Sequence, residues 1–368
     1  MKVYVQMPHL GGVEYHRLYA PLRQLAEDNQ LGGGDMDVRV VEQFLPEHIE
    51  ACDVLIFNRT LGPMTGKILK AMRKLRKPVI CDVDDFWELP SKHVSARYYY
   101  EKNITGQIRD AVKHSWAVTC TNGVLADQVR KLNSNVHILP NAIDLTAEQW
   151  NKPHTGKQQR IRFGWVGGLT HLDDTALLFE PIRYLLKEYP EQVQIVVCGY
   201  QPGDSVESPE RQIWQGMISN LMGGGLAKGE QIVVAPGVPA TEYGEFYTHF
   251  DVALAPLEGG LFNRCKSDLK ILEAAAYGLP VIASATHPYS SHAKNDGVLL
   301  AHDAEDWFEH MAMFVEHPEL ISIYGMDNHV YCQQHRDFVA INLKRYNLIK
   351  RAYKLHTATP HRVSEGNT

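Results

Sequence analysis

Long hydrophobic runs are absent from the sequence, and no apolar stretch approaches the ~20 residues that a membrane-spanning helix requires. The apolar stretch after Met1 is interrupted at Pro8 and is too short for a secretory signal peptide. Internal repeats and low-complexity tracts are also missing. The sequence therefore predicts a soluble protein without an integral membrane segment.

Cysteine is scarce, and the few that occur show no paired spacing. Six cysteines are scattered through the chain: Cys52, Cys81, Cys120, Cys198, Cys265 and Cys332. Single cysteines within or beside apolar segments are typical of reduced thiols and not of disulfides or zinc ligands. We therefore expect a cytoplasmic location.

An excess of positive charge is also missing, because 37 Lys and Arg stand against 43 Asp and Glu, a formal net charge of −6. This balance argues against strong nonspecific binding to DNA, although a local basic patch can override it. The length of 368 residues is too great for one core and fits two domains.

Apolar strands alternate with helical segments along most of the chain. Continuous apolar strands in this alternation indicate parallel sheets that are covered on both faces, so we predict an α/β protein with two Rossmann-like, doubly wound domains. The expected boundaries are an N-terminal domain, a polar linker, a C-terminal domain, a helix that returns to the N-terminal domain and a disordered tail: 1–145, 146–160, 161–335, 336–357 and 358–368.

The segment 262–284 is predicted to form a loop, a helix and a buried strand. Lys266, Lys270 and Glu273 have the spacing i, i+4, i+7, so they share one face of a helix. A helix that starts near Ser267 points free backbone amides and its positive dipole end at whatever precedes it, which suits a phosphate. A solvated amphipathic helix with a Lys/Glu surface pair explains the same spacing.

Two pairs of glycines follow predicted strands. Gly11 and Gly12 come after the strand at 3–7, and Gly167 and Gly168 after the strand at 161–166. A strand, a glycine turn and a helix start allow a close approach by phosphate. A plain tight turn is equally compatible with two glycines.

Three carboxylates, Asp82, Asp84 and Asp85, stand at the end of the apolar strand that begins near Val79. Ligands of open α/β sheets gather at the carboxyl ends of the strands. The acids could bind a metal or cap a helix, but no histidine ligand accompanies them, and we expect no metal.

These segments resemble the GT-B retaining glycosyltransferases of family 4, also called glycosyl transferases group 1. The resemblance covers the segments 11–16, 77–87, 136–144 and 161–171 in this order, and also the helix of 262–284. It implies a GT-B fold with two Rossmann-like domains facing a central cleft. It also implies an enzyme that moves a sugar from a nucleotide diphosphate sugar, most simply a UDP-sugar, to an acceptor hydroxyl, and that requires no metal or cofactor.

The resemblance assigns donor-binding roles. Glu273 matches the glutamate that holds the ribose, while the family's first glutamate, eight residues earlier, is replaced by Cys265. The family's Arg/Lys diphosphate clamp is absent beyond residue 166. By position, the remaining donor contacts fall to both glycine pairs, to the backbone amides of the helix start and to neighbouring side chains: Glu258, Asn263, Arg264, Lys266, Ser267, Asp268, Leu269 and Lys270.

Catalytic residues are implied at the acid cluster. Asp84 and Asp85 align with a His-Asp pair that faces the transferred sugar, and Asp84 would orient hydroxyls there or act as a base. The resemblance implies retention of the anomeric configuration.

The acceptor is the least specified part. The compact size and the segment 263–270 resemble family members of bacteriophages, some of which modify DNA by glycosylating hydroxymethylated bases. If a phage encodes the protein, its expected location is the host cytoplasm. Acceptor-binding residues would be Lys92, His93, Arg97 and Tyr98, where cations meet phosphates and aromatics stack on a base. A packed amphipathic helix explains the same residues. Lipid-linked and saccharide acceptors, a GT-B epimerase or phosphorylase and a non-catalytic nucleotide-sugar-binding protein remain alternatives, and the oligomeric state is unknown.

Overall fold

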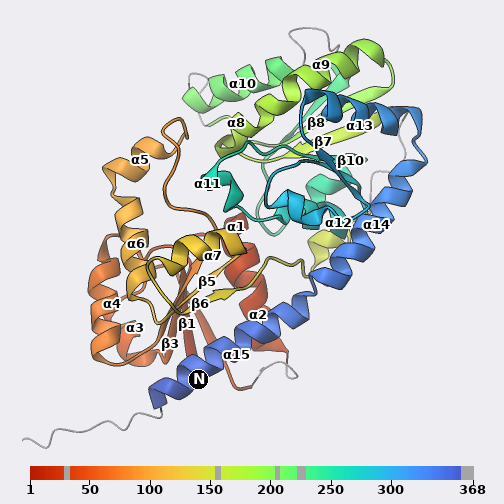
Figure 1. Cartoon of the computed structure of the whole chain (residues 1–368). Coiled ribbons are helices and arrows are strands. Elements are labelled where there is room, and N and C mark those ends of the chain that lie inside the picture. The colour runs from red at the N-terminus through yellow and green to blue at the C-terminus, as the bar shows by residue number, and fades with distance from the viewer. Residues whose placement is uncertain (29–33, 154–158, 204–207, 222–228, 358–368) are drawn as a thin grey trace, which may run out of the picture. The chain divides into compact units, whose positions relative to one another are not determined.

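The computed structural model describes residues 1–28, 34–153, 159–203, 208–221 and 229–357, so the tail predicted at 358–368 lies outside the described residues. The chain forms two compact units (Figure 1). Unit 1 comprises Met1–Trp87, Tyr99–Pro140 and Val339–Thr368, and unit 2 comprises Glu88–Tyr98 and Asn141–Phe338. Residues 88–98, which fall within the predicted N-terminal domain, therefore cluster with unit 2.

Unit 1 contains a six-stranded parallel sheet in the order β2-β1-β3-β4-β5-β6. Its strands are β1 Lys2–Gln6, β2 Asp37–Val41, β3 Val54–Asn58, β4 Val79–Val83, β5 Ala117–Cys120 and β6 Val136–Ile138. The strand order reverses between β1 and β3, and ligands of doubly wound sheets bind beyond the carboxyl ends of the strands at such a switch point.

Helices cover both faces of this sheet (Figure 1). On one face, Leu18, Leu22 and Leu25 of the segment that ends in α2 (Ala20–Glu27) pack with Leu348 and Ile349 of α15 (Phe338–Thr357) against apolar strand residues. Successive strand residues point to opposite faces, so the other face meets the buried sides of α4 (Thr65–Lys74) and α6 (Ile104–His114). The smaller helices are α1 Gly12–Glu14, α3 Pro46–Ala51, α5 Ala96–Glu101 and α7 Gly123–Arg130.

Unit 2 contains a second six-stranded parallel sheet, in the order β12-β11-β10-β7-β8-β9. Its strands are β7 Ile161–Val166, β8 Val193–Tyr200, β9 Ile232–Pro236, β10 Val252–Ala255, β11 Val281–Ser284 and β12 Val298–Ala301. Read from β9, this is the dinucleotide-binding order 3-2-1-4-5-6, whose switch point lies between the first and fourth strands. That point is the boundary between β7 and β10.

Two apolar clusters pack on the two faces of this sheet. One includes Trp165, Trp214 and Trp307 and joins the strands to α9 (Phe179–Glu188), α10 (Pro209–Leu221) and α13 (Ala304–Glu316). The other joins the strands to α12 (Leu269–Ala276) and reaches Cys332 of α14 (Leu320–His335). The prediction of two doubly wound parallel sheets is confirmed.

The helical pattern of residues 174–188, which follow the strand at 161–166, predicts one continuous helix, and the structure shows that this prediction is wrong. The expected helix 174–188 is divided into α8 (Leu172–Thr175), a 3₁₀ turn (Ala176–Leu178) and α9. Pro181 is the physical reason, because its ring clashes with the carbonyl four residues earlier, at Leu177, and lets a regular helix begin only at Phe179.

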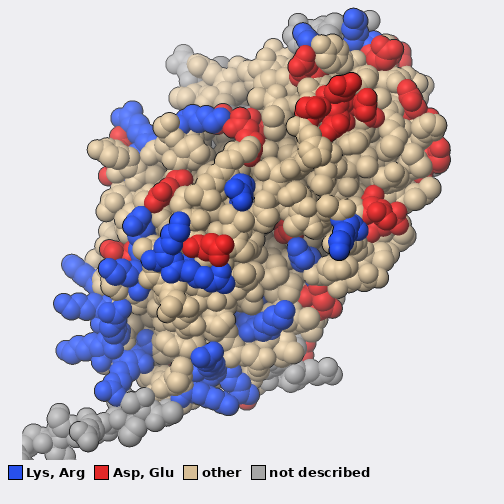
Figure 2. Space-filling model, in the orientation of Figure 1, with Lys and Arg blue, Asp and Glu red and all other residues tan. Residues whose placement is uncertain are grey.

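The two units carry opposite charge. Unit 1 has 22 Lys and Arg against 16 Asp and Glu, and unit 2 has 15 against 27. Figure 2 shows Lys and Arg gathered on the surface over α4 and α6 of unit 1. Within the described ranges, no helix is both long enough and apolar enough to cross a membrane.

Candidate functional site

The switch point of unit 2 gathers three segments of the chain. Gly167 and Gly168 follow β7, the loop 256–260 follows β10, and α12 begins beyond the short helix α11 (Leu261–Arg264). A side-chain contact ties two of them together, because Lys270 of α12 donates a hydrogen bond to the carbonyl of Val166 at the end of β7. Most of the residues that the sequence predicts for a donor site lie in these three segments.

The glycine turn is built by close backbone approach. The amide of Gly167 donates to the carbonyl of Cys198 (3.1 Å), next to Gly199 in β8. Gly199 has a φ of +97°, and a Cβ on it would lie 2.4 Å from the Gly167 carbonyl oxygen. A Cβ on Gly168, in contrast, would meet open space. Gly168 thus leaves room for a ligand, while Gly167 and Gly199 shape the turn.

Lys266 lies in a buried polar cluster just before α12. Its Nζ is 3.2 Å from Nδ1 of His171 and 3.7 Å from Oδ2 of Asp174. The same His171 nitrogen lies 3.1 Å from Asp174 Oδ2. Burial and the Lys266 ammonium lower the pKa of His171 to about 4, so the imidazole is neutral at neutral pH.

Lys270 is the second cation of this region. Burial is the main cause that lowers its pKa, to about 8, and the Lys266 ammonium adds to the effect against the carboxylate of Glu273. Its Nζ also lies 5.8 Å from the centre of the Trp165 ring. An ammonium with this pKa is charged at neutral pH, and a bound anion would stabilise its charged form.

The amino end of α12 offers backbone donors. The hydrogen bonds among the described residues do not use the amides of Ser267, Asp268 and Leu269, as expected for the first turn of a helix. The Asp268 carboxylate has a structural role instead, because it accepts hydrogen bonds from His292 Nε2 (2.9 Å) and Arg336 Nη2 (2.8 Å). Burial opposes its ionisation, but these two partners outweigh burial and lower the pKa of Asp268 to about 2.

Glu273 does not lie on a solvated surface. Only 3% of the residue is exposed, and its Oε2 accepts a hydrogen bond from the Tyr247 hydroxyl (2.6 Å). Burial and the Glu273 carboxylate raise the pKa of Tyr247 well above its ordinary value. The alternative of a solvated Lys/Glu helix face is therefore wrong. Lys266 also precedes α12, so only Lys270 and Glu273 share a helix face.

The loop before α12 is held by Asp174. Its Oδ1 accepts from the backbone amide of Glu258 (2.9 Å) and from Nδ2 of Asn263 (3.1 Å). Arg264 is exposed, and Cys265, which stands where the resembling family has a glutamate, is fully buried. Asn263 therefore shapes this loop, and Arg264 has the freedom to reach a ligand.

The predicted acceptor residues all lie in the segment 88–98 of unit 2. Lys92 Nζ lies 2.7 Å from Glu258 Oε2 and 3.5 Å from Asp173 Oδ2, so its charge is paired within the unit. The His93 ring packs edge-on against Phe262 at 5.4 Å between centres. Arg97 and Tyr98 belong to α5, and Tyr98 is 55% exposed.

The acid cluster of unit 1 forms a buried ion-pair network at the ends of β3 and β4. Arg17 binds Asp82 through both carboxylate oxygens (2.7 and 3.0 Å). Arg59 binds Asp84 in the same way (2.7 Å for each contact), and Asn58 Nδ2 donates to Asp84 Oδ1 (3.0 Å). Burial opposes ionisation of Asp84, but Arg59 outweighs it, so the pKa of Asp84 is lowered.

Arg59 was not predicted from the sequence. It follows β3 at the switch point of unit 1, has a φ of +56° that is unusual for a residue with a side chain, and lies 3.9 Å from Asp85. The sequence signal for Arg59 was its position directly after an apolar strand, because ligands bind beyond the carboxyl ends of such strands. Gly11 and Gly12 follow β1 in the same unit, and a Cβ on Gly12 would meet open space.

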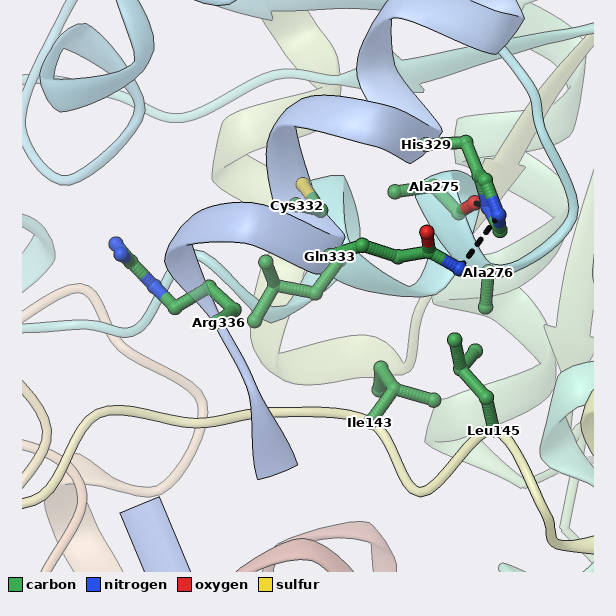
Figure 3. Close-up of a pocket in the computed structure, with 9 residues that line it drawn as sticks. Ile143, Leu145, Ala275, Ala276, His329, Cys332, Gln333 and Arg336 are labelled. Atoms are coloured by element: carbon green, nitrogen blue, oxygen red, sulfur yellow. Dashed lines mark hydrogen bonds between the residues drawn. The ribbon is translucent and has the colours of Figure 1, made fainter. Parts of the chain in front are cut away.

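Two cavities of unit 2 differ in size. The pocket in Figure 3 lies beside α12 and α14, where Ile143 and Leu145 face it and Gln333 is bonded to His329 (2.8 Å). Its volume of about 30 Å³ suits about one water molecule. A larger cavity of about 590 Å³ opens beyond the carboxyl ends of β10, β11 and β12 and is bordered by Glu258. Only this second cavity is large enough for a sugar.

The sequence profile of the family described as Glycosyl transferases group 1 matches residues 160–317, which make up most of unit 2. No curated protein matches the chain. The chain thus carries a glycosyltransferase domain, and the prediction of this enzyme class is confirmed.

Solved structures share the fold over nearly the whole chain. Sucrose-phosphate synthase from Thermosynechococcus elongatus is 14% identical with a TM-score of 0.65, and the match covers 98% of this chain and 100% of that one. HepE from Anabaena, in complex with UDP and glucose, is 13% identical with a TM-score of 0.62 over 95% and 100% of the chains. A UDP-forming trehalose-phosphate synthase from Burkholderia xenovorans is 13% identical with a TM-score of 0.55 over 84% and 75%. These likenesses show the GT-B fold.

Proposed function

We propose that the protein transfers a sugar from a nucleotide diphosphate sugar, with a UDP-sugar as the first candidate, to an acceptor hydroxyl. The observation that carries the proposal is the meeting of Lys266, Lys270 and the amino end of α12 at the switch point of unit 2. A phosphate group is the ligand that such a combination of cations and free amides favours. The structure of HepE with UDP supports the choice of UDP.

The chemistry of sugar transfer explains this arrangement. Cleavage of the sugar–phosphate bond leaves negative charge on the diphosphate and positive character on the sugar. Lys266, Lys270 and the α12 amides stabilise the first of these charges in a partly buried place, where electrostatic interactions are stronger than in water. We assign the ribose to Glu273, whose Tyr247 hydrogen bond fixes the carboxylate, and the diphosphate to Gly167, Gly168 and the α12 start.

The remaining donor contacts belong to the loop before α12. We assign sugar hydroxyls to Glu258 and Asn263, and a phosphate oxygen to Arg264. Glu258 borders the cavity of about 590 Å³, which has room for the sugar. Lys92 shields the Glu258 carboxylate in the free protein, so a sugar hydroxyl that binds Glu258 competes with this ion pair.

We assign Asp84 and Asp85 to the acceptor side, with retention of the anomeric configuration as in the resembling family. The paired and ionised state of Asp84 supports a role in orienting hydroxyl groups and not a role as a base, because a carboxylate with a lowered pKa attracts protons weakly. Gly11, Gly12 and Arg59 lie at the switch point of the same unit.

We propose a hydroxymethylated base in DNA as the acceptor to test first. The excess of Lys and Arg over Asp and Glu in unit 1 and the exposed Tyr98 support an acidic, aromatic acceptor. A saccharide or a lipid-linked sugar is the alternative.

A transfer assay tests the proposal. Labelled UDP-, GDP- and ADP-sugars would be paired with cytosine DNA, hydroxymethylcytosine DNA, simple glycosides and lipid extract. We expect label to pass from a UDP-sugar to one acceptor, and Lys270→Met to reduce this transfer. Lys294→Met is the matched control, because Lys294 is an exposed lysine of the same unit outside the site.

Each other outcome points to a different function. Turnover of the donor without any acceptor would indicate an epimerase or phosphorylase. Tight UDP-sugar binding without turnover would indicate a binding protein. Label in glycosides but not in hydroxymethylcytosine DNA would remove the DNA acceptor and leave the donor site standing.

A further inference from the structure

Unit 1 also has a groove. It lies at the amino-terminal ends of the strands, whereas the acid cluster lies at their carboxyl ends. It has a volume of about 270 Å³ and opens at the amino-terminal ends of β4 and β5, beside Val79 and Trp116. Its walls are the ends of α4, α6 and α15. The groove is therefore separate from the residues assigned to sugar transfer.

The groove is lined by basic side chains. Arg73, Arg76, Lys77, His114 and His356 contribute to its walls, and the described residues that line it include no Asp or Glu. Arg73 Nη2 lies 3.1 Å from His114 Nδ1, and His356 Nδ1 lies 3.2 Å from the carbonyl of Arg76. Lys77 Nζ donates to the carbonyls of Glu50 (2.6 Å) and Cys52 (2.7 Å). The positive charges of Arg73, Arg76 and Lys77, with no carboxylate in the lining, attract an anion.

Arg76 occupies a position that favours glycine. It follows the C-cap of α4 with a φ of +57°, and the amides of Arg76 and Lys77 donate to the carbonyls of Arg73 and Met72. This is the Schellman termination, in which the left-handed residue is usually glycine. An arginine here accepts backbone strain and places a guanidinium at the groove, and such strain points to a function of the side chain.

The surrounding surface extends the positive charge. The exposed lysines and arginines on α4, α6 and α15 include Lys67, Lys70, Lys74, Arg109, Lys113 and Lys354. Asp110 of α6 and Glu47 and Glu50 of α3 are the acids on these and the adjoining helix. Figure 2 shows the basic side chains as the prevailing charge over α4 and α6.

We propose that this groove binds the phosphate group of a phosphate ester. Arginine forks suit phosphate oxygens, His114 and Ser115 add polar groups, and Trp116 offers an apolar wall to the ester substituent. The volume accepts a phosphate with a small organic group. The ester is either a free small molecule or the headgroup of an anionic phospholipid, since both present the same group.

Binding measurements with two probes test the proposal. Glycerol 3-phosphate is titrated by calorimetry without added nucleotide, and glycerol serves as the uncharged control. Vesicles of phosphatidylcholine with and without phosphatidylglycerol are compared by sedimentation. We expect binding of glycerol 3-phosphate or of vesicles that contain phosphatidylglycerol, weakened by added salt, and no binding of glycerol or of vesicles of phosphatidylcholine alone, whose headgroup has no net charge.

Variants locate the site. Arg76→Gly relieves the left-handed strain, so its Tm equals or exceeds that of the unmodified protein, while its affinity for the phosphate probe falls by at least about tenfold. Arg73→Gln should lower affinity similarly. Lys344→Gln, an exposed lysine of α15 outside the groove, should leave affinity unchanged.

The outcomes separate clearly. Glycerol 3-phosphate binding identifies a free ester, and binding only to phosphatidylglycerol vesicles identifies a lipid headgroup. No binding of either probe, or binding that survives both Arg76→Gly and Arg73→Gln, overturns the proposal. Because no step measures sugar transfer, the proposal can fail while the glycosyltransferase function stands.

Discussion

Lys266 Nζ lies 3.2 Å from Nδ1 of His171, and the imidazole remains neutral beside the ammonium. The Asp174 carboxylate lies near both groups and balances one positive charge. Lys270 adds a second ammonium group, which the Glu273 carboxylate influences, and the two ammonium groups can bind a diphosphate. We propose that these lysines take the place of the Arg/Lys clamp of the resembling family, from the other side of the switch point.

Lys270 should make donor binding depend on pH. Its pKa of about 8 means that the ammonium is charged below pH 8 and loses its proton above it. UDP affinity measured by calorimetry should therefore fall as the pH rises from 7 to 9. Lys270→Met should weaken binding at pH 7 by about 1.5–3 kcal/mol and remove this pH dependence.

Stability should respond in the opposite direction. The pKa of Lys270 is lower in the folded than in the unfolded chain, so its charged form disfavours folding, and this cost disappears as the pH rises above 8. Lys270→Met should therefore raise the Tm at pH 7. A lower Tm together with unchanged UDP affinity would contradict the assignment.

Substitutions of Glu273 and Tyr247 should have different effects on UDP affinity and on the free energy of unfolding. Glu273→Ala should weaken UDP binding by about 1–3 kcal/mol, because a charged hydrogen bond to the ribose is lost. Tyr247→Phe removes only the internal hydrogen bond and should lower the free energy of unfolding by about 1 kcal/mol with a smaller effect on binding. Equal losses of affinity in both variants would place Glu273 outside the ribose site.

Asp84→Asn should abolish transfer while sparing donor binding, because Asp84 belongs to unit 1 and the donor residues to unit 2. If the carboxylate orients hydroxyl groups, the profile of kcat/KM against pH for the unmodified protein should show no inflection from Asp84 between pH 5 and 8. Full activity of Asp84→Asn would reject its catalytic assignment.

Arg59→Gln should lower the free energy of unfolding by about 3 kcal/mol, since it leaves Asp84 buried without its partner.

Asp268 should contribute to acid stability. Its pKa is about 2 in the folded chain, below the ordinary value, so its ion pairs stabilise the protein by about 2 kcal/mol above pH 4, and this is lost as the pH falls through 2. Asp268→Asn should lower stability at neutral pH and flatten the acid-unfolding curve in this range. An unchanged curve would show that Arg336 and His292 find other partners.

The six cysteines should be inert in the folded protein. All are buried and free, and burial raises the pKa of Cys198 to about 12. A thiol reagent at pH 8 should therefore label the native chain slowly and all six thiols after unfolding. Fast labelling of the native chain would show that at least one segment opens readily.

The sequence predicted the strands and both sheets because parallel strands that are buried on two faces are continuous apolar runs, as in Val54–Asn58 and Val252–Ala255. The glycine turn and the helix before β11 were also readable, since glycine, proline and polar spacing act locally. Pro181 was a local signal for the break before α9, but the amphipathic pattern of the segment favoured one continuous helix.

Partners that are distant in sequence could not be predicted. Tyr247 and Glu273 are 26 positions apart, and Lys266 and His171 are 95 apart. Their contacts depend on how two strands lie side by side, which local patterns do not specify. For the same reason Glu273 was compatible with a solvated surface, and the pairing of Lys92 with Glu258, across 166 positions, was not foreseen.

Gly199 is not among the residues assigned to the donor, yet its position in the fold allows almost no other residue. A side chain there would meet both an unfavourable φ and the carbonyl of Gly167. Divergent sequences that keep this donor turn must therefore keep glycine in two places, and a change at 199 would have to be matched by a rebuilt turn. Residue 199 therefore limits how the proposed donor site can evolve, although it belongs to the neighbouring strand.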